Sequence, residues 1–311
     1  MRVLVTGGAG FIGSHVADAL LAAGHEVSIV DDLSSGRREN VPEGARFFQG
    51  DIRDPQLVSR VFAEARPEVV SHQAAQTSVS VSTREPVRDA EINVIGSIHL
   101  LNEAVRAGLQ RFVFASTGGA IYGEVPGDER APVDRAPRPL SPYACSKYAV
   151  ECYLEAYRKE HGLQHTVLRY ANVYGPRQDP HGEAGVIAIF AQRLLAAEPI
   201  QVNARKEPGD AGCVRDYVYV QDVVRANLLA VEGELPAPVV NVCTGVATAT
   251  RELAEAMAAQ LGTDAVINDA PRRAGDVERS VLDGGEFLEA HPATDLETGL
   301  RETLDWFRAR A

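Results

Sequence analysis

Tyr143 and Lys147 are the two residues whose types and spacing most clearly allow chemistry. They follow Ser141-Pro142, a pair typical of the cap and first turn of a helix, so the phenol and the ammonium are expected on one helix face. Lysine is otherwise rare, with three among the 31 basic residues. Because a neighbouring cation favours phenolate, we expect Tyr143 to act as a general base with its pKa lowered toward neutral pH.

A second group of residues with a chemical use lies near the N-terminus, in the pattern Gly7-x-x-Gly10-x-x-Gly13 after an apolar run. Glycines at this spacing between a strand and a helix let the backbone approach a pyrophosphate, and the helix start offers free N–H groups. Asp31 ends the next apolar run, where a carboxylate binds the adenosine ribose and repels a 2′-phosphate. The pattern favours NAD, with NADP as the alternative because arginines occupy positions 37 and 38.

These residues need a scaffold, and short β-branched runs alternate with helical periodicity over the first 170 residues. The expected strands cover 3–6, 26–31, 46–49, 69–73, 111–116 and 166–170, and the expected helices cover 11–23, 56–65, 92–107 and 143–161. Such alternation predicts a parallel sheet covered on both faces. The expected fold is α/β, a doubly wound Rossmann-type sheet with a smaller C-terminal substrate-binding lobe.

The composition changes after residue 170, where Gly, Pro and charged residues concentrate in 174–182 and 204–212. Loop-rich segments of this kind suit a substrate lobe. A strand at 214–220, a strand at 239–242 and helices at 221–231 and 250–261 are too few for an independent domain. We expect residues 1–170 to bind NAD and residues 171–311 to form a smaller lobe interleaved with returns to the main sheet.

Overall composition limits the partners. The 311 residues carry a formal net charge of -12, which disfavours nucleic acid and anionic membrane surfaces. The four cysteines show no CxxC and no metal-ligand spacing, so we expect buried structural thiols, a reducing compartment and no metal. An apolar segment starts directly after Met1, and no apolar stretch reaches membrane-spanning length, which predicts a cytoplasmic protein.

The glycine pattern and Tyr143-x-x-x-Lys147 together resemble the extended short-chain dehydrogenase/reductase family of NAD-dependent epimerases and dehydratases. Gly50-Asp51-Ile52, Gln73-Ala74-Ala75 and Asn93 extend the likeness over essentially the whole chain. The cofactor contacts that the resemblance implies are Gly7, Gly10, Phe11, Ile12, Gly13, Asp31, Asp32, Ser34, Gly36, Asp51, Ile52, Gln73, Ala74, Ala75, Asn93, Tyr143, Lys147 and Tyr170.

The segment 114–123 resembles the family's Ser/Thr-rich strand end, whose hydroxyl relays a proton between sugar and tyrosine. Thr117 is assigned this role, with Ser116 as the alternative. Family dehydratases carry Asp-Glu immediately after the threonine, where this chain has Gly118 and Gly119. The resemblance therefore implies 4-epimerisation of a nucleotide-diphosphate hexose such as UDP-glucose or UDP-galactose, through a transient 4-keto sugar and with NAD regenerated in each cycle.

The resemblance also implies where the nucleotide sugar binds. Arginine matches phosphate geometry, and Arg215 and Arg273 are assigned to the diphosphate. Ser280 stands where some relatives have a large aromatic that excludes N-acetylated sugars, so both sugar forms are expected to bind. The full set of implied substrate contacts is Thr117, Asn172 as a further phosphate donor, Val186, Arg215, Arg273, and Asp276 at the nucleoside ribose.

Other interpretations remain at this point. The chain could be a dehydratase or reductase acting on a related nucleotide sugar, or a regulator that binds NAD without catalysis. Regulators of that kind typically lose the tyrosine or the lysine, and both are present here. A homodimer formed through residues 92–107 and 143–161 is implied by the family resemblance.

Overall fold

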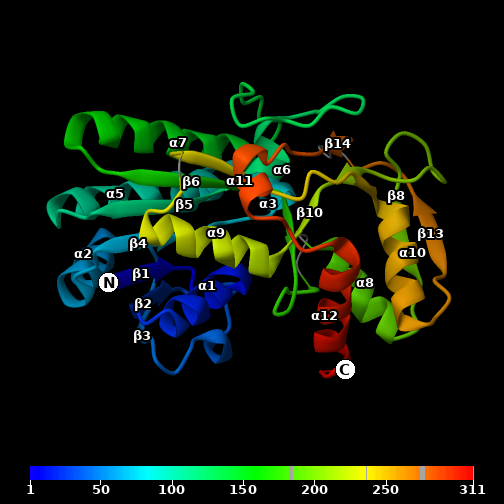
Figure 1. The fold of residues 1–311 in the computed structure, drawn as a ribbon, viewed down its shortest axis with the longest axis horizontal. Helices are drawn as coiled ribbons and strands as arrows, with labels where there is room; N and C mark the ends of the chain where they lie inside the picture. The colour runs from blue at the N-terminus through cyan, green and yellow to red at the C-terminus, as the bar shows by residue number, and fades with distance from the viewer. Residues whose placement is uncertain (182–184, 236, 274–276, 311) are drawn as a thin grey trace. The chain divides into compact units, whose positions relative to one another are not determined.

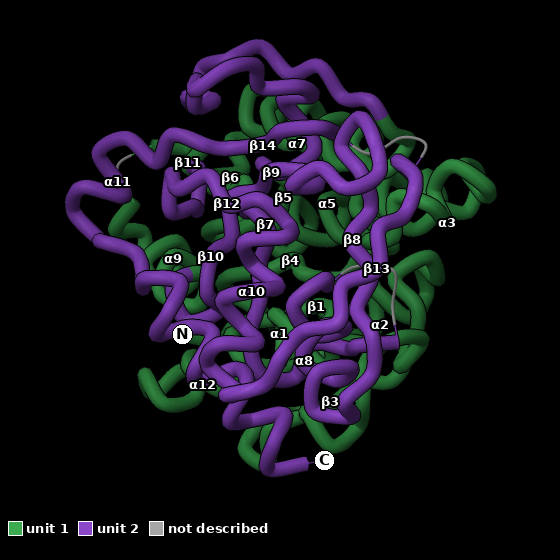
Figure 2. Tube along the Cα trace, turned by 90° about the vertical axis from the view of Figure 1, so that its right-hand side faces the viewer, with its two compact units in different colours: residues 1–117, 141–169, 223–240 green, residues 118–140, 170–222, 241–311 purple. Residues whose placement is uncertain are grey.

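The protein was analysed as a computed structural model that describes residues 1–181, 185–235, 237–273 and 277–310 (Figure 1). Its chain divides into two compact units, coloured separately in Figure 2. Unit 1 comprises residues Met1–Thr117, Ser141–Arg169 and Val223–Val240. Unit 2 comprises residues Gly118–Leu140, Tyr170–Asp222 and Asn241–Ala311.

A seven-stranded sheet in the order β11-β6-β5-β4-β1-β2-β3 forms the framework. Its strands are β1 (Arg2–Thr6), β2 (Glu26–Asp31), β3 (Arg46–Gln49), β4 (Val69–His72), β5 (Arg111–Thr117), β6 (His165–Tyr170) and β11 (Val239–Val242). Strand β1 pairs in parallel with both β2 and β4. The chain order reverses there, and ligands of open α/β sheets bind beyond the carboxyl ends of strands at such a point.

Helices cover both faces of this sheet, which confirms the doubly wound prediction. The helices concerned are α1 (Phe11–Ala22), α2 (Pro55–Ala65), α5 (Gly96–Arg106), α7 (Pro142–His161) and α9 (Val220–Glu232). On one face, Val70 and Phe112 of the strands form a buried apolar core with α2, α5 and α7. On the other, the Ser71 hydroxyl donates to Asn227 of α9 at 3.5 Å. Neighbouring residues of β4 thus serve opposite faces.

The segment before α5 differs from the single helix expected at 92–107. Two short helices before α5, α3 (Val79–Arg84) and α4 (Pro86–Ala90), lead into a π-helical turn, η2 (Glu91–Ile95). The first such short turn of the chain, η1 (Arg38–Asn40), is a 3-10 turn that lies between β2 and β3. Turns of π-helix are rare in proteins, and those that occur often lie at functional sites.

Unit 2 is built from short sheets and a helical layer. Its strands are β7 (Asn172–Tyr174), β8 (Ile200–Asn203), β9 (Val214–Arg215), β10 (Tyr217–Tyr219), β12 (Thr248–Ala249), β13 (Ile267–Ala270) and β14 (Arg279–Ser280). Its helices are α6 (Gly118–Ile121), α8 (Val186–Leu195), α10 (Thr250–Leu261), α11 (Gly285–Ala290) and α12 (Leu296–Arg308). Helices α8, α10 and α12 pack against one another.

The single strand expected at 214–220 is wrong, because β9 and β10 belong to different sheets on either side of Asp216. Asp216 is fully buried, and its carboxylate accepts hydrogen bonds from the N–H groups of Thr244, Gly245 and Leu282. A buried carboxylate needs such donors, so the chain turns inward here.

The expectations about the cysteines and about membrane-spanning segments can also be compared with the structure. All four cysteines are free thiols, but only Cys213 and Cys243 are buried, whereas Cys145 and Cys152 are exposed, which corrects the expectation of four buried thiols. None of the helices in the described ranges combines the length and apolar composition needed to cross a bilayer.

Candidate active site

The glycine turn after β1 has the geometry that a dinucleotide requires. Gly7 adopts a φ of +68°, and a Cβ added there would lie 2.7 Å from the Ala74 nitrogen. A Cβ on Gly13 would lie 2.1 Å from the Gly7 carbonyl oxygen. Gly10 caps α1 without any side-chain hydrogen bond, so the positive helix start is open to an anion. These residues fit the pyrophosphate of NAD.

Asp31 lies buried at the end of β2, directly beside this turn. Its carboxylate accepts hydrogen bonds from the N–H groups of Ala9 at 3.0 Å and Leu33 at 2.8 Å. Burial raises the pKa of Asp31, and the two backbone donors oppose that shift. A Cβ on Gly36 would lie 2.8 Å from the Asp31 carboxylate, so the segment after β2 closes over it. The structure therefore brings the expected ribose-binding carboxylate next to the glycine turn.

Other predicted cofactor residues lie around the same turn. Phe11 and Ile12 form the first turn of α1. Asp32 accepts hydrogen bonds from the backbone and hydroxyl of Ser34, at 2.9 and 2.6 Å. The predicted cofactor residues that follow β1 and β2 therefore lie at the carboxyl ends of these two adjacent strands.

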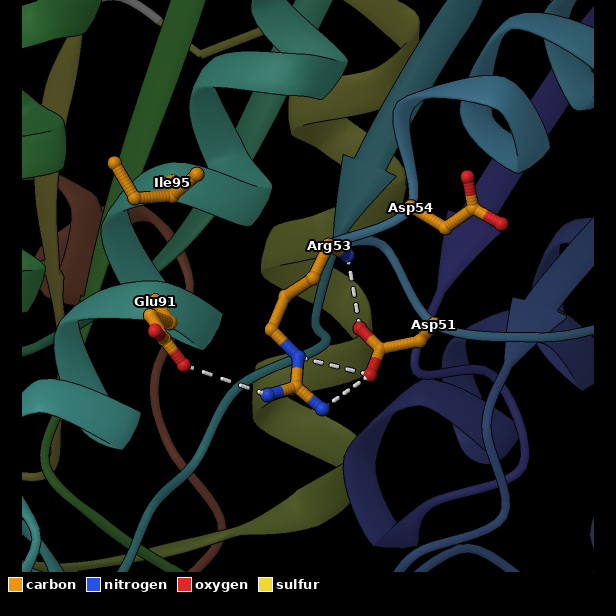
Figure 3. Close-up of a pocket in the computed structure, with 5 residues that line it drawn as sticks. All are labelled: Asp51, Arg53, Asp54, Glu91 and Ile95. Carbon is orange, nitrogen blue, oxygen red and sulfur yellow. Dashed lines mark hydrogen bonds and ion pairs between the residues drawn. The ribbon is translucent and has the colours of Figure 1, made fainter.

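Asp51 and Ile52 follow β3, where Asp51 lines a pocket with Arg53, Asp54, Glu91 and Ile95. Figure 3 shows the Arg53 guanidinium between two carboxylates, bonded to Asp51 at 2.6 Å and lying 3.7 Å from Glu91. Burial acts to raise the pKa of Asp51, but the hydrogen bonds from Arg53 outweigh it and lower that pKa. The sequence prediction missed Arg53. Ile52 is buried in the core of unit 1.

Helix α7 carries Tyr143 and Lys147, the two residues proposed for catalysis, at the predicted positions. The Ser141 hydroxyl caps it by accepting the N–H of Ala144 at 3.2 Å, and Pro142 occupies its first position. Tyr143 lies in the first turn and Lys147 one turn later. Because side chains four apart share a helix face, both are presented from one side of α7.

Tyr143 is partly buried and forms a hydrogen bond with the Thr117 hydroxyl. Burial of the phenol raises the pKa of Tyr143 to about 12, the Thr117 bond opposes the shift, and the charge of Asp89 adds to it. In the protein alone the direction is therefore opposite to the lowering expected from Lys147. The physical reason is that burial desolvates the phenolate, and this effect is larger than the lowering by the Thr117 hydrogen bond.

Lys147 is 4% exposed and lies over the Phe114 ring, 4.5 Å from its centroid. Burial lowers the pKa of Lys147 to about 7, whereas the negative charges of Asp89 and Glu151 act to raise it. At neutral pH this side chain is consequently poised between ammonium and amine.

Ser116 and Thr117 are adjacent at the end of β5, but they have different partners. The Ser116 hydroxyl donates to Glu151 at 2.5 Å. Glu151 in turn forms a buried ion pair with Arg169, at 2.6 Å. Thr117 contacts Tyr143 instead. The two hydroxyls that the sequence left as alternatives are therefore distinguished by their partners, since only Thr117 contacts Tyr143 among the described contacts.

Asn93, Gln73 and Ala74 are held by internal hydrogen bonds. The Asn93 amide accepts the N–H of Gln76 at 2.8 Å and donates to Ser146 of α7 at 3.1 Å. The Gln73 amide donates to Asn227 of α9 at 2.9 Å. The Ala74 N–H donates to the hydroxyl of Thr6 at 3.1 Å, and Ala75 follows it in the same loop. Tyr170 is buried at the end of β6.

The predicted substrate residues lie in unit 2, except for Thr117. Asn172 of β7 donates its amide to the Asp216 carbonyl at 3.1 Å, and Arg215 of β9 donates to the Val214 carbonyl at 3.0 Å. Arg273 is exposed, and Val186 begins α8. Asp276 lies outside the described residues.

Sequence reasoning missed two buried carboxylates near Lys147. Glu151 was open to prediction, because it follows Lys147 by one further turn on the same helix. Asp89 stands four positions before Asn93, but its surroundings depend on the unforeseen α4 and η2 segments. A local pattern therefore gave no reason to bury it.

A dinucleotide turn at the switch point of a parallel sheet, with a tyrosine, a lysine and a hydroxyl on neighbouring elements, defines the short-chain dehydrogenase/reductase class. Residues 3–243 match the model of the NAD dependent epimerase/dehydratase family, and the chain belongs to this family.

Relatives over the full length narrow the comparison. A UDP-glucose 4-epimerase from Mycolicibacterium smegmatis is 44% identical, with 100% of both chains covered. A crystal structure of the Thermus thermophilus UDP-glucose 4-epimerase in complex with NAD is 53% identical, with a TM-score of 0.97 and 100% of both chains covered. The Thermotoga maritima UDP-glucose 4-epimerase, solved with UDP-glucose, is 47% identical, with a TM-score of 0.93 and coverage of 100% and 99%.

Proposed function

We propose that this protein is an NAD-dependent 4-epimerase that interconverts UDP-glucose and UDP-galactose. The observation that carries the proposal is the Tyr143 phenol bonded to Thr117 one helical turn from buried Lys147, within a unit whose glycine turn fits a dinucleotide. Full-length relatives that carry the name UDP-glucose 4-epimerase, and solved relatives with NAD or with UDP-glucose, support it.

The residues of the chain supply the proton transfers. NAD, when bound, supplies a hydride acceptor that returns the same hydride. Thr117 passes the proton of the sugar 4-hydroxyl to the phenolate oxygen of Tyr143. After the 4-keto sugar has turned over in the site, so that hydride adds to its opposite face, the same residues return a proton to the carbonyl oxygen. Lys147 stabilises the phenolate by its charge. We assign the relay to Thr117 because Ser116 already donates to Glu151.

The family includes dehydratases, so the choice of reaction needs its own argument. Removal of water from the sugar requires an additional acid and base after the threonine. Helix α6 starts there with Gly118 and Gly119, which offer neither. The side chains after Thr117 therefore favour oxidation and return at one carbon over dehydration.

The sugar nucleotide is assigned to residues 171–311, the proposed substrate lobe, with residues 1–170 as the proposed NAD-binding domain. Arg215 and Arg273 hold the diphosphate, supported by Asn172 and Val186, and Asp276 takes the ribose. Ser280 is buried in β14 and pairs with Arg215 across the β9–β14 ladder. Its small side chain supports acceptance of N-acetylated sugars. A homodimer and a cytoplasmic location stay predictions from the sequence.

The direct test is to incubate the purified protein with UDP-galactose, without added NAD, and to separate the products by chromatography. We expect UDP-glucose to form with no net production of NADH. A 4-keto-6-deoxy product would indicate a dehydratase, and net consumption of NADH or NADPH would indicate a reductase. Bound NAD with no turnover of any nucleotide sugar would indicate a regulator.

A further inference from the structure

Asp89 is a carboxylate in an unusual environment at the end of the short helix α4. Asp89 is only 1% exposed, although aspartate is rarely buried without a cationic partner. One oxygen, Oδ1, accepts hydrogen bonds from the amides of Gln76 at 2.7 Å and Asn93 at 3.1 Å. The other oxygen, Oδ2, is buried and has no hydrogen-bond partner among the residues that the structure describes. Because an unsatisfied buried carboxylate oxygen is costly, its presence calls for an explanation.

The negative charge of Asp89 acts on the catalytic helix. Helix α4 packs against α7, and the field of Asp89 reaches both Tyr143 and Lys147. For Lys147 this charge favours the ammonium and so opposes the effect of burial. For Tyr143 it disfavours the phenolate. Asp89 therefore influences the proton content of both members of the pair.

The other titratable groups that face Lys147 are already balanced. Glu151, the second carboxylate, is paired with Arg169 at 2.6 Å and accepts the Ser116 hydroxyl. The imidazole of His72 is buried, and burial lowers the pKa of His72 to about 3, so it is neutral near pH 7. Glu151 still acts on Lys147, but the charge of Asp89 is the larger of the two influences.

The charged residues near Asp89 in the chain do not neutralise it. Arg84, Glu85, Arg88 and Glu91, in α3, α4 and η2, are all exposed. Arg88 pairs with Glu85 at 3.1 Å. The donors that Asp89 does have are neutral amides, which orient a carboxylate without cancelling its charge.

We propose that Asp89 is a positioning residue that keeps a larger share of Lys147 in the ammonium form than burial alone would allow. Desolvation drives the buried lysine toward the neutral amine, and an uncompensated carboxylate on the adjacent helix opposes that drive. The Gln76 and Asn93 amides bind Oδ1 and fix the orientation of Asp89. The charge of the carboxylate is therefore not cancelled by a cation and can act on Lys147. The catalytic meaning of this role rests on the proposed function, whereas the electrostatic role does not.

Asp89→Asn tests this role because the asparagine keeps the shape and the Oδ1 acceptor while removing the charge. Lys147 can be followed by NMR in full-length protein labelled with ¹³C at the lysine Cε. The other two lysines, Lys159 and Lys206, are exposed, and the Lys147 signal is the one absent from Lys147→Met. We expect the Lys147 titration midpoint to fall by about one pH unit in Asp89→Asn. That shift corresponds to about tenfold less ammonium at a pH above both midpoints.

Two control variants separate the buried charge from exposed charges of the same helix. Glu85→Gln removes an exposed charge from the residue that caps α4, and Arg88→Gln removes the exposed charge that pairs with it. Both are expected to leave the Lys147 midpoint unchanged. The proposal is overturned if Asp89→Asn leaves the midpoint unchanged, or if either control lowers it equally.

The same shift should be visible in catalysis. The alkaline limb of the kcat profile for UDP-galactose is expected to move to lower pH in Asp89→Asn, with KM unchanged, because the ammonium is lost earlier. If the native protein turns over no nucleotide sugar but the NMR midpoint still falls, the proposed function fails while the role of Asp89 stands. A structural defect alone would lower activity at every pH and leave the midpoint in place.

Discussion

The candidate proton-transfer groups of unit 1 are largely buried among specific partners, whereas the candidate arginines of unit 2 are less buried. In unit 1, Tyr143 is bonded to Thr117, and Lys147 is buried over an aromatic ring. In unit 2, Arg215 is only partly buried, donates to the Val214 carbonyl and forms no ion pair with the described residues, and Arg273 is exposed. Groups that transfer protons need burial and fixed partners to shift their pKa values, but groups that bind a diphosphate must offer unused donors.

This contrast predicts different kinetic effects for the two units. A substitution in the proton-transfer group of unit 1 should lower kcat, because that interaction operates in the transition state. A substitution of an arginine proposed to bind phosphate in unit 2 should raise KM, since a diphosphate remote from the reacting carbon is expected to be held equally in ground state and transition state.

The largest effect is expected for Tyr143→Phe, which removes the proton acceptor and keeps the ring. We expect kcat for UDP-galactose to fall by about 10³-fold, within the range for loss of a general acid–base, while NAD remains bound. Steady-state kinetics and the absorbance of bound cofactor would measure both. Tyr153→Phe is the matched control, because Tyr153 is exposed on the same helix. Activity within tenfold of native in Tyr143→Phe would contradict the role of the phenol.

A smaller effect is expected for Thr117→Ala, which removes the hydroxyl bonded to Tyr143. We expect kcat to fall by about 10²-fold, with little change in stability. Ser116→Ala should show the reverse, because it removes one of the hydrogen bonds to the buried Glu151 carboxylate, which keeps those from Arg169, and so lowers the free energy of unfolding by about 1 to 3 kcal/mol. Kinetics and urea denaturation of both variants would check this. A larger loss of kcat in Ser116→Ala would transfer the relay to Ser116.

Much of unit 1 could be predicted from the sequence because its signals are local. The bounds of β2 and β3 match the expected runs, and α7 begins and ends at its Ser141 cap and at Gly162, whose φ is 71°. The Gly7 turn and the spacing of Tyr143 and Lys147 likewise depend on adjacent residues. Helix periodicity and caps carry such information directly.

What could not be predicted depends on contacts between distant residues. The burial of Asp89 requires Gln76 and Asn93 to meet it, and no local pattern forecasts a π-helical turn. The pKa of Tyr143 rises rather than falls because desolvation follows from tertiary packing. From the sequence we expected Asp216 in the middle of a strand, but its three backbone N–H donors come from residues 244, 245 and 282.

The smallest effect in this comparison is expected for Arg215→Met, which retains much of the side-chain volume and removes the cation. We expect KM for UDP-galactose to rise by about tenfold with kcat within about twofold, the effect of losing roughly one charge-assisted hydrogen bond. The expected rise should shrink at high ionic strength, because screening weakens the native interaction as well. Arg301→Met, an exposed arginine of α12, is the control. A fall in kcat with unchanged KM would instead place Arg215 with the transition-state groups and remove the distinction between the two units.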